Sequence, residues 1–345
     1  MAFVVLLGLI YVGLRYFGYV PSGENIDIYS YDLNEKKKIQ ITSDHFIQRN
    51  PDIFGNIIIW EDERGRYFGL YGFNLATNKV FQIASASGIC HRQMHPAIYG
   101  DIVVWSDCRN GYDDVYSYDL STNTESQITT DKANQNHPDI YGDIIVWIDG
   151  RNGTHDIYAY EISTRKEFRL TTYDSYKSDP VIYEDLVVWV DDRAGNSQII
   201  GYDISSGKEF SVSESSSYQI SPAIYENIVV WADGRNGNSD IYGYNLSTQK
   251  EFQITSNPLA QESPAIYGNI IVWEDLRNIN SGHRDIYGYD LAKGEEFHVV
   301  VLHYGEIELN NLDSFIRPII YDGIIAWHDK ENDSATSYLG KYEVN

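Results

Sequence analysis

The chain repeats one pattern of apolar and polar positions about every 42 residues. Its seven tryptophans mark the repeat, with successive spacings of 45, 42, 42, 42, 42 and 54 residues. Seven of the nine prolines occupy one further position of the repeat, at the head of the apolar run that ends at each tryptophan. Self-similarity at such a period indicates stacked structural units. The tryptophans are Trp60, Trp105, Trp147, Trp189, Trp231, Trp273 and Trp327.

Each repeat predicts four short strands, which we name A to D. Strand A begins at the proline, which cannot donate to a ladder and suits a strand start, as at Pro96. Strand B is apolar on consecutive positions up to the tryptophan, as expected of a strand covered on both faces. An Asn-Gly pair such as Asn236-Gly237 favours a hairpin turn into strand C. Strand C alternates, as in 240–246, and strand D follows at 251–255.

Four-stranded antiparallel units at this period are typical of the blades of a β-propeller, so we expect an all-β fold with seven blades. The first C and D strands, at 27–33 and 38–42, precede any tryptophan, and the last A and B strands, at 317–321 and 323–327, end the repeats. Pairing of these N- and C-terminal strands would complete one blade and close the ring. The alternative has eight blades, in which residues 6–20 form a degenerate A–B hairpin and the last blade is incomplete.

We expect residues 1–24 to form a separate apolar leader and residues 25–345 to form a single propeller domain. Residues 2–20 are apolar apart from Arg15, which is long enough to span a membrane or to act as a secretion signal. We expect a membrane anchor or signal here, with the degenerate hairpin as the alternative.

The charge balance excludes one class of partner. The chain has 50 Asp and Glu against 26 Lys and Arg, a formal net charge of −24, which opposes binding to nucleic acid. The hydrophobic fraction of 43% is high enough for a packed core. Two cysteines are too few for a disulfide scaffold or a four-cysteine zinc site.

The repeat motif resembles a known family. The pattern Trp-x-Asp-x-Arg-Asn-Gly-x-x-Asp-Ile-Tyr-x-Tyr-Asp-Leu, followed by Gln-Ile-Thr, is similar to the WD40-like (PD40) repeat of TolB-type β-propellers and of archaeal cell-surface propellers. The resemblance covers roughly residues 25–345 and implies a propeller fold. Some propellers that resemble this family are lyases of acidic sugars, in which His and Gln hold a metal at the channel mouth. His95, His137, Gln93 and Gln135 are the residues here that match such a set.

The D–A and B–C connections share one face, and two repeat positions there predict a ligand-binding ring at the channel mouth. Glutamines at one of them would offer amide groups to a sugar or peptide. The alternative is that each Gln bonds the neighbouring blade's backbone and holds the D–A crossover. The candidate ring residues are Gln48, Asn50, Gln93, His95, Gln135, His137, Lys177, Asp179, Gln219, Gln261 and Arg317, with Ser221 and Ser263 at the same pre-proline position.

An Asp two residues after each tryptophan, and an Arg two residues later in six repeats, predict a structural clasp in the B–C turn. A charged binding ring is the alternative, but a site for one ligand does not need six copies of one pair. The clasp pairs are Asp107 with Arg109, Asp149 with Arg151, Asp191 with Arg193, Asp233 with Arg235, and Asp275 with Arg277.

The first long spacing falls in a D–A loop that contains Cys90, His91 and His95, and Cys108 lies in the B–C turn of the same blade. A disulfide between Cys90 and Cys108 is one interpretation, if the protein is exported. A metal site built from Cys90, His91, His95, Cys108 and His137 is the other, and a divalent metal would then be the cofactor. The spacing matches no standard metal motif.

The sequence contains no catalytic motif such as Gly-x-Ser-x-Gly, His-Glu-x-x-His or a phosphate-binding loop. We therefore expect a non-catalytic, monomeric propeller, exported to the cell surface, which binds a protein or glycan partner on the D–A/B–C face. One alternative is a metal-dependent lyase acting on an acidic oligosaccharide at the channel mouth. Another is a purely structural component of the cell envelope. Membrane contact is expected only through residues 2–20.

Overall fold

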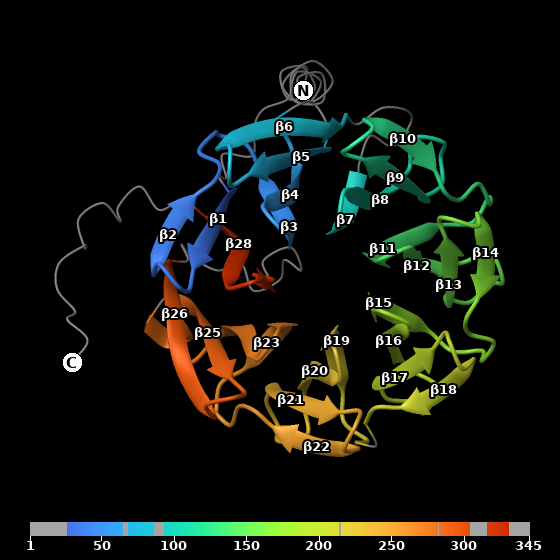
Figure 1. Ribbon diagram of the computed structural model, residues 1–345. Helices are drawn as coiled ribbons and strands as arrows, with labels where there is room; N and C mark the ends of the chain where they lie inside the picture. Colours follow the sequence, from blue (N-terminus) through green and yellow to red (C-terminus); the bar gives the residue numbers. More distant parts are fainter. Residues whose placement is uncertain are drawn as a thin grey trace, which may run out of the picture.

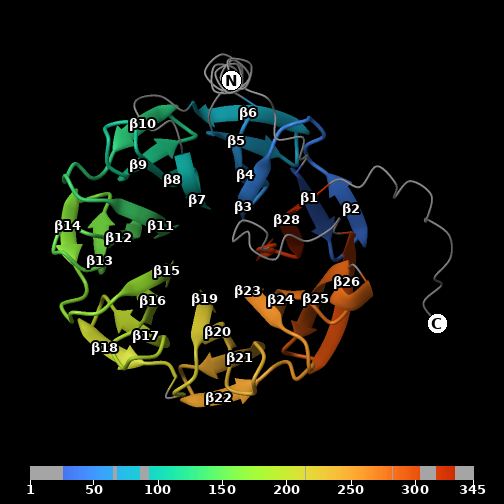
Figure 2. The same ribbon diagram turned by 180° about the vertical axis from the view of Figure 1, so that it is seen from behind.

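Seven four-stranded antiparallel sheets stand in a ring, so the chain forms the predicted seven-bladed β-propeller (Figure 1). The computed structural model describes residues 26–64, 68–85, 93–213, 215–281, 283–303 and 316–330. Strand A of each blade lies nearest the central axis and strand D lies at the rim, as the view from behind also shows (Figure 2). The one helical segment within these ranges is the short 3-10 turn η1 (Ile279–Ser281).

The strands of each blade follow one another along the chain, in the order A to D. The first three complete blades are β3 (Gln48–Phe54), β4 (Ile57–Asp62), β5 (Gly69–Asn74) and β6 (Lys79–Ala84); β7 (Gln93–Tyr99), β8 (Ile102–Asp107), β9 (Asp114–Asp119) and β10 (Thr124–Gln127); and β11 (Gln135–Tyr141), β12 (Ile144–Asp149), β13 (Asp156–Glu161) and β14 (Lys166–Arg169). The next three are β15 (Lys177–Tyr183), β16 (Leu186–Asp191), β17 (Gln198–Asp203) and β18 (Lys208–Ser211); β19 (Gln219–Tyr225), β20 (Ile228–Asp233), β21 (Asp240–Asn245) and β22 (Lys250–Gln253); and β23 (Gln261–Tyr267), β24 (Ile270–Asp275), β25 (His283–Asp290) and β26 (Glu295–His303).

The two ends of the repeat region share the seventh blade. Strands β1 (Ile26–Asp32) and β2 (Lys37–Gln40) join β27 (Ile319–Tyr321) and β28 (Ile324–Lys330) in one sheet of order β2-β1-β28-β27. β1 pairs with β28 along its whole length, from Ile26 opposite Lys330 to Asp32 opposite Ile324. The eight-blade alternative is therefore wrong, because β1 and β2 complete the blade that β27 and β28 begin.

The predicted leader, residues 1–24, lies outside the described residues. Within the described ranges, no helix is long and apolar enough to cross a membrane.

The core consists of apolar layers between neighbouring blades. Every tryptophan is fully buried. Trp147 packs with Val104 and Val115 of the preceding blade, whereas Val146 packs toward Trp189 of the following one. Consecutive residues of strand B thus enter two different layers, which explains why the run is apolar at every position.

At the A–B end of the channel, the last residue of every A strand is aromatic, and the seven rings form a closed collar. Each ring contacts both neighbours, with centroid separations from 4.4 Å (Tyr99 and Tyr141) to 5.0 Å (Tyr183 and Tyr225). Hydrogen bonds join the hydroxyl groups of successive tyrosines, and burial raises the pKa of Tyr141, Tyr183, Tyr225, Tyr267 and Tyr321. The members of this aromatic collar are Phe54, Tyr99, Tyr141, Tyr183, Tyr225, Tyr267 and Tyr321.

Phe54 is the one collar member without a hydroxyl group. It lies between Tyr99 and Tyr321, and its ring centroid is 4.6 Å from that of Tyr99 and 4.8 Å from that of Tyr321. We expect Phe54→Tyr to raise the free energy of unfolding by about 1 kcal/mol, because the new hydroxyl can link the two ends of the hydrogen-bonded series. Urea denaturation measures the change, and Phe54→Leu, which removes ring contacts, should lower stability. A destabilised Phe54→Tyr protein would show that the gap in the series is required.

Candidate functional site: the channel mouth

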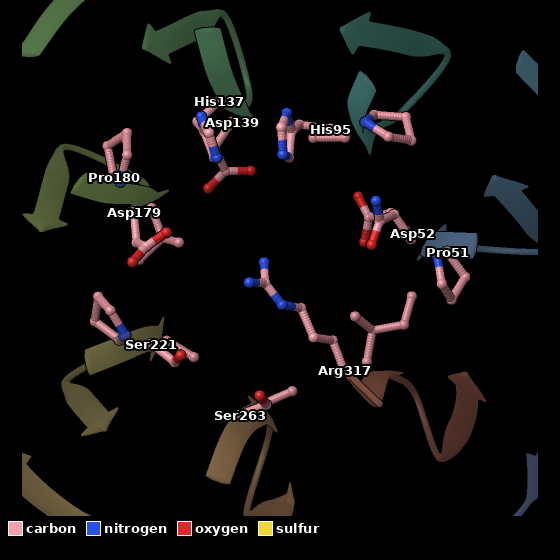
Figure 3. A pocket seen from close by; sticks show the side chains of 18 of the residues that line it. Pro51, Asp52, His95, His137, Asp139, Asp179, Pro180, Ser221, Ser263 and Arg317 are labelled. Carbon is pink, nitrogen blue, oxygen red and sulfur yellow. The ribbon is translucent and has the colours of Figure 1, made fainter. Parts of the chain in front are cut away.

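A break in each inner strand creates the mouth of the channel on the D–A/B–C face. The ladder between β11 and β12 is interrupted at His137 and Pro138, and the same shift occurs in the other five complete blades. The pre-proline residue in these blades has a positive φ, from 49° at Asp179 to 55° at His95. Asn, Asp and His tolerate this left-handed backbone better than most residues do. The bulge ends the regular alternation and turns the pre-proline side chain toward the axis (Figure 3).

The mouth encloses a cavity of about 300 Å³ to which all seven blades contribute. The pre-proline residues form its outer tier, and the residues after the prolines form an inner tier. The outer tier is Asn50, His95, His137, Asp179, Ser221, Ser263 and Arg317. The inner tier is Asp52, Ala97, Asp139, Val181, Ala223, Ala265 and Ile319.

Charge is unevenly distributed around this cavity. The carboxylates Asp52, Asp139 and Asp179 belong to β3, β11 and β15, whereas the blades of β19 and β23 contribute only Ser and Ala beside their prolines. Arg317 is exposed and precedes β27, and its side chain extends across the mouth toward the side that carries His137 and Asp179 (Figure 3). Asp139 and Asp179 therefore make one side of the mouth acidic, and Asp52 lies across the mouth from Asp179 (Figure 3). Arg317 is the one cation among the residues that line the cavity.

The inner-tier carboxylates also join neighbouring blades. One oxygen of Asp52 accepts a hydrogen bond from the backbone N–H of Ile98 at 2.8 Å, and Asp139 accepts one from Ile182 at 2.8 Å. Burial raises the pKa of Asp52 to about 7, and the negative charge of Asp139 adds to this effect. Burial likewise raises the pKa of Asp139 to about 6. Both carboxyl groups thus change charge near neutral pH.

Asp52→Asn should remove part of the pH dependence of stability. The pKa of Asp52 is higher in the folded protein, about 7, than its ordinary 3.8, so the unfolded chain loses this proton first as the pH rises. The contribution of this group to stability is complete below about pH 4 and is lost as the pH rises through about 7. Between pH 5 and pH 8.5, the variant should gain on the order of 2 kcal/mol relative to wild type in urea denaturation. The exposed control Asp185→Asn should keep the wild-type profile; an unaltered profile in Asp52→Asn would contradict the assignment.

The two histidines of the outer tier stack on each other, with ring centroids 3.7 Å apart and an interplanar angle of 26°. Burial lowers the pKa of His137; the charge of Asp179 opposes this shift, and Arg317 adds to it. His137 is consequently uncharged at neutral pH, so it does not neutralise the acidic side. Nδ1 of His137 lies 3.2 Å from Oδ1 of Asn136.

Glu61, on β4, holds two outer-tier residues from behind. It is fully buried and accepts hydrogen bonds from Nδ2 of Asn50 at 2.9 Å, from the backbone N–H of His95 at 2.8 Å and from Nε of Arg49 at 3.0 Å. Sequence reasoning missed Glu61, Asp52 and Asp139. The available signals were an acidic residue directly after a buried tryptophan and an Asp directly after the repeat proline in two blades.

The glutamines do not line the cavity, which corrects the prediction for Gln48, Gln135, Gln219 and Gln261 as ligand contacts. All four are fully buried, and their amides hold the D–A crossovers: Gln135 donates to the carbonyl of Ala133 at 2.6 Å, Gln48 to Asp44, Gln219 to Ser213 and Gln261 to the carbonyl of Leu259. Gln219 also accepts the N–H of Ile199 from the preceding blade, at 3.1 Å. The side chain of Gln93 lies outside what the structure describes.

Lys177 stands where four other repeats have this buried Gln. The prediction that Lys177 contacts a ligand at the channel mouth is corrected in the same way. It is fully buried, and Nζ donates to the carbonyls of Tyr173 and Ser175 at 2.6 and 3.0 Å. Burial lowers its pKa, and the nearby charges of Asp191 and Asp156 oppose that shift. Its ammonium group therefore supports the crossover rather than the cavity.

The repeated Asp and Arg form a clasp around the buried indole in each of the six complete blades. In the third complete blade, Asp149 accepts a hydrogen bond from Nε1 of Trp147 at 3.0 Å and from Nη2 of Arg151 at 2.6 Å. The Arg151 guanidinium lies 4.4 Å from the ring centre of Tyr158 and bonds Glu167 at 2.5 Å. Equivalent Asp–Arg ion pairs join Asp62 to Arg64, Asp107 to Arg109, Asp191 to Arg193, Asp233 to Arg235, and Asp275 to Arg277.

Two of the five residues in the predicted metal site, Cys90 and His91, lie outside the described residues. Of the other candidates, His95 and His137 face each other at the mouth, and Cys108 is buried and does not line the cavity. In the described part of the chain, no three His, Cys, Asp or Glu side chains are grouped to hold a metal ion. No described cysteine is free, and the pairing of Cys108 with Cys90 stays a prediction.

Comparison with known proteins gives the fold but no family assignment. No family model and no curated protein matches the sequence. A putative TolB from Agrobacterium tumefaciens is 15% identical, with 90% of this chain and 99% of that chain covered and a TM-score of 0.55. An oligogalacturonate lyase in complex with manganese is 13% identical over 91% and 98%, with a TM-score of 0.61. A puromycin hydrolase is 9% identical over 84% of this chain and 54% of that one, with a TM-score of 0.64. The chain is thus a seven-bladed β-propeller whose fold is similar to that of TolB and of propeller enzymes.

Proposed function

We propose that the protein is a non-catalytic binding propeller that takes part of a partner molecule into the channel mouth on the D–A/B–C face. The observation that carries this proposal is the outer tier of the cavity. Its seven positions hold Asn, His, His, Asp, Ser, Ser and Arg, whereas the tryptophan, proline and clasp Asp beside them recur in every repeat. The repeat varies at positions where all seven blades line one cavity, which is where a ligand site is expected.

The lyase alternative receives less support from the same residues. The lyase-like metal set consists of His95, His137, Gln93 and Gln135. Of these, Gln135 is buried and bonds its own D–A crossover, and the two histidines stack face to face instead of converging on one point. The similarity to the lyase is at the level of fold, and a fold does not determine an activity. An assay for unsaturated uronate products from oligogalacturonate, with added manganese, would overturn the non-catalytic proposal if product formed.

The binding test is a screen of peptide and glycan arrays with the wild-type protein and with a blocked mouth. Ser221→Trp would fill the cavity, since His95 and His137 already place rings at equivalent positions with the same backbone conformation. The matched control is Ser206→Trp, on the exposed C–D turn of the opposite face. We expect array ligands to be lost with Ser221→Trp and kept with Ser206→Trp, with both variants melting near wild type. Ligands that bind all three proteins equally would overturn the proposal.

We also propose an exported, cell-surface location, on the basis of the apolar residues 2–20 and the acidic composition. Cell fractionation, with the protein followed by antibody, tests it; recovery in the cytoplasmic fraction alone would overturn it. A purely structural role in the envelope would leave the arrays empty.

A further inference from the structure

The three carboxylates of the mouth lack the arginine partner that the clasp carboxylates have. The clasp Asp residues are each paired with an arginine in six blades, at 2.5 to 2.7 Å. In the described part of the chain, Asp52, Asp139 and Asp179 form no ion pair, and they face a cavity that opens to solvent. Their hydrogen bonds come from neutral donors, such as the backbone N–H of Ile98 and of Ile182. Above about pH 7, where Asp52 and Asp139 are ionised, the cavity wall thus carries negative charge that no ion pair among the described residues neutralises.

Arg317 indicates what kind of group approaches this wall. It occupies the outer-tier position of the closing blade, and its guanidinium extends over the cavity toward the acidic side (Figure 3). Its positive charge acts on His137, on the far side of the mouth, and lowers the pKa of that residue. The side chain is exposed and makes no ion pair in the described residues, so a ligand can displace it at little cost.

Two exposed tyrosines belong to the D–A connections that lead into β15 and β19, on the same face as the mouth. Tyr176 and Tyr218 occupy the same repeat position in adjacent blades and are 55% and 58% exposed. The charge of Asp179 acts on the hydroxyl of Tyr218, and the ring of Tyr176 lies 4.6 Å from that of His155. Exposed aromatic faces next to carboxylates attract cations through both charge and the ring quadrupole.

The protein itself uses this combination for arginine. In the second complete blade, the guanidinium of Arg109 lies between the carboxylate of Asp107 at 2.5 Å and the ring of Tyr116 at 4.2 Å. The D–A/B–C face offers the same two kinds of partner, the carboxylate of Asp179 and the exposed ring of Tyr218, with no arginine paired to that carboxylate in the described residues.

We propose that the mouth binds the guanidinium or ammonium group of a basic protein segment, with Asp179 and Asp139 as carboxylate partners and Tyr176 and Tyr218 as the aromatic wall. The inference rests on the proposed binding function and names its ligand class. The exposed tyrosines extend the contact surface beyond the cavity of about 300 Å³, which fits a side chain presented on a polypeptide better than a small free cation. Arg317 then occupies the place of the ligand in the free protein and competes with it.

Fluorescence anisotropy with four labelled pentapeptides tests the proposal. The probes are Gly-Ser-Xaa-Ser-Gly, in which Xaa is Arg, Lys, Glu or citrulline, the uncharged analogue of Arg. We expect the Arg and Lys peptides to bind at least tenfold more tightly than the citrulline and Glu peptides at low salt, and the preference to shrink as salt is added. Equal binding of the Arg and citrulline peptides would overturn the inference.

Variants separate the site from the bulk charge of the protein. Asp179→Asn should weaken binding of the Arg peptide at least fivefold, whereas Asp185→Asn, an exposed control with the same change in net charge, should not alter it. Arg317→Ala should strengthen binding severalfold by removing the competitor. Equal losses in Asp179→Asn and Asp185→Asn would show non-specific attraction and overturn the inference, as would spermidine binding more tightly than the peptide. If Ser221→Trp blocks the array ligands but those ligands show no preference for cationic groups, only this inference fails. If no ligand binds at the mouth, the proposed function fails as well.

Discussion

Asp149→Ala is expected to lower the free energy of unfolding by about 3–5 kcal/mol, whereas Arg151→Ala should cost only about 1–2 kcal/mol. Asp149 is fully buried, and its two oxygens accept the indole N–H of Trp147, the backbone N–H of Arg151 and two guanidinium donors. Without the carboxylate, the fully buried indole N–H has no partner. Without the arginine, Asp149 still bonds Trp147, and Arg151 is near enough to the surface for water to replace it.

Urea denaturation of the two variants measures this difference, and Asp185→Ala provides an exposed control with no expected effect. Peptide binding at the mouth should be unchanged in Arg151→Ala, because the clasp residues do not line the cavity. If Arg151→Ala abolished binding while leaving stability intact, the repeated Asp–Arg pairs would belong to a binding surface. If Asp149→Ala cost no more than Arg151→Ala, the indole hydrogen bond would not be the central element of the clasp.

The closing blade lacks two features of the clasp, the indole hydrogen bond within the described residues and the arginine in the sequence. Trp327 is fully buried like the others, but its Nε1 has no hydrogen-bond partner among the described residues. The sequence has Glu331 where six repeats have arginine, and Glu331 lies outside the described residues. In this blade, strands B and C are joined by the β1–β28 ladder, which runs from Ile26 opposite Lys330 to Asp32 opposite Ile324.

The sequence predicted the features that recur in every repeat. Tryptophans at a fixed spacing, prolines at strand starts and Asp–Arg pairs after each tryptophan were enough to predict the blades and the closure of the ring by the chain ends. These features recur because each blade solves the same packing problem against its neighbours. A sevenfold repetition of one solution is visible in one sequence without any alignment.

The orientation of side chains at the mouth could not be predicted, because it depends on the bulge. In a regular strand, Gln135 and His137 would point to the same side. The left-handed backbone at His137 breaks that alternation, so that His137 faces the cavity and Gln135 is buried in the crossover. The bulge also separates Asp139 from Gln135, so that Asp139 lines the channel with His137 although regular alternation would place it on the side of Gln135.

Removal of Arg284 should cause the other large loss of stability. Arg284 on β25 is 4% exposed and forms an ion pair with the fully buried Glu274 of β24. The second oxygen of Glu274 accepts the backbone N–H of Ile316 at 3.1 Å, which ties the sixth complete blade to the segment that leads into β27. Burial raises the pKa of Glu274, and Arg284 opposes that shift. Arg284 also opposes the shift that burial imposes on the pKa of Glu262.

We expect Arg284→Met to cost about 3–5 kcal/mol, because it leaves buried carboxyl groups without their cation. The pKa of Glu274 in the folded protein should then rise further above its ordinary value of 4.5. A raised folded-state pKa means that stability is lost as the pH increases, so the deficit of Arg284→Met should be larger at pH 8.5 than at pH 6.

Urea denaturation at the two pH values, with two companion variants, separates the buried pair from general effects of the substitution. Arg284→Met/Glu274→Gln keeps an acceptor for the N–H of Ile316 and removes the uncompensated charge, so it should recover most of the lost stability and all of the added pH dependence. Lys293→Met breaks a surface pair with Asp290, in which the lysine is 70% exposed, and should change stability by less than about 1 kcal/mol. If the double variant were no more stable than Arg284→Met, the loss would reflect packing around β25; recovery would show that the ring closes on a buried ion pair.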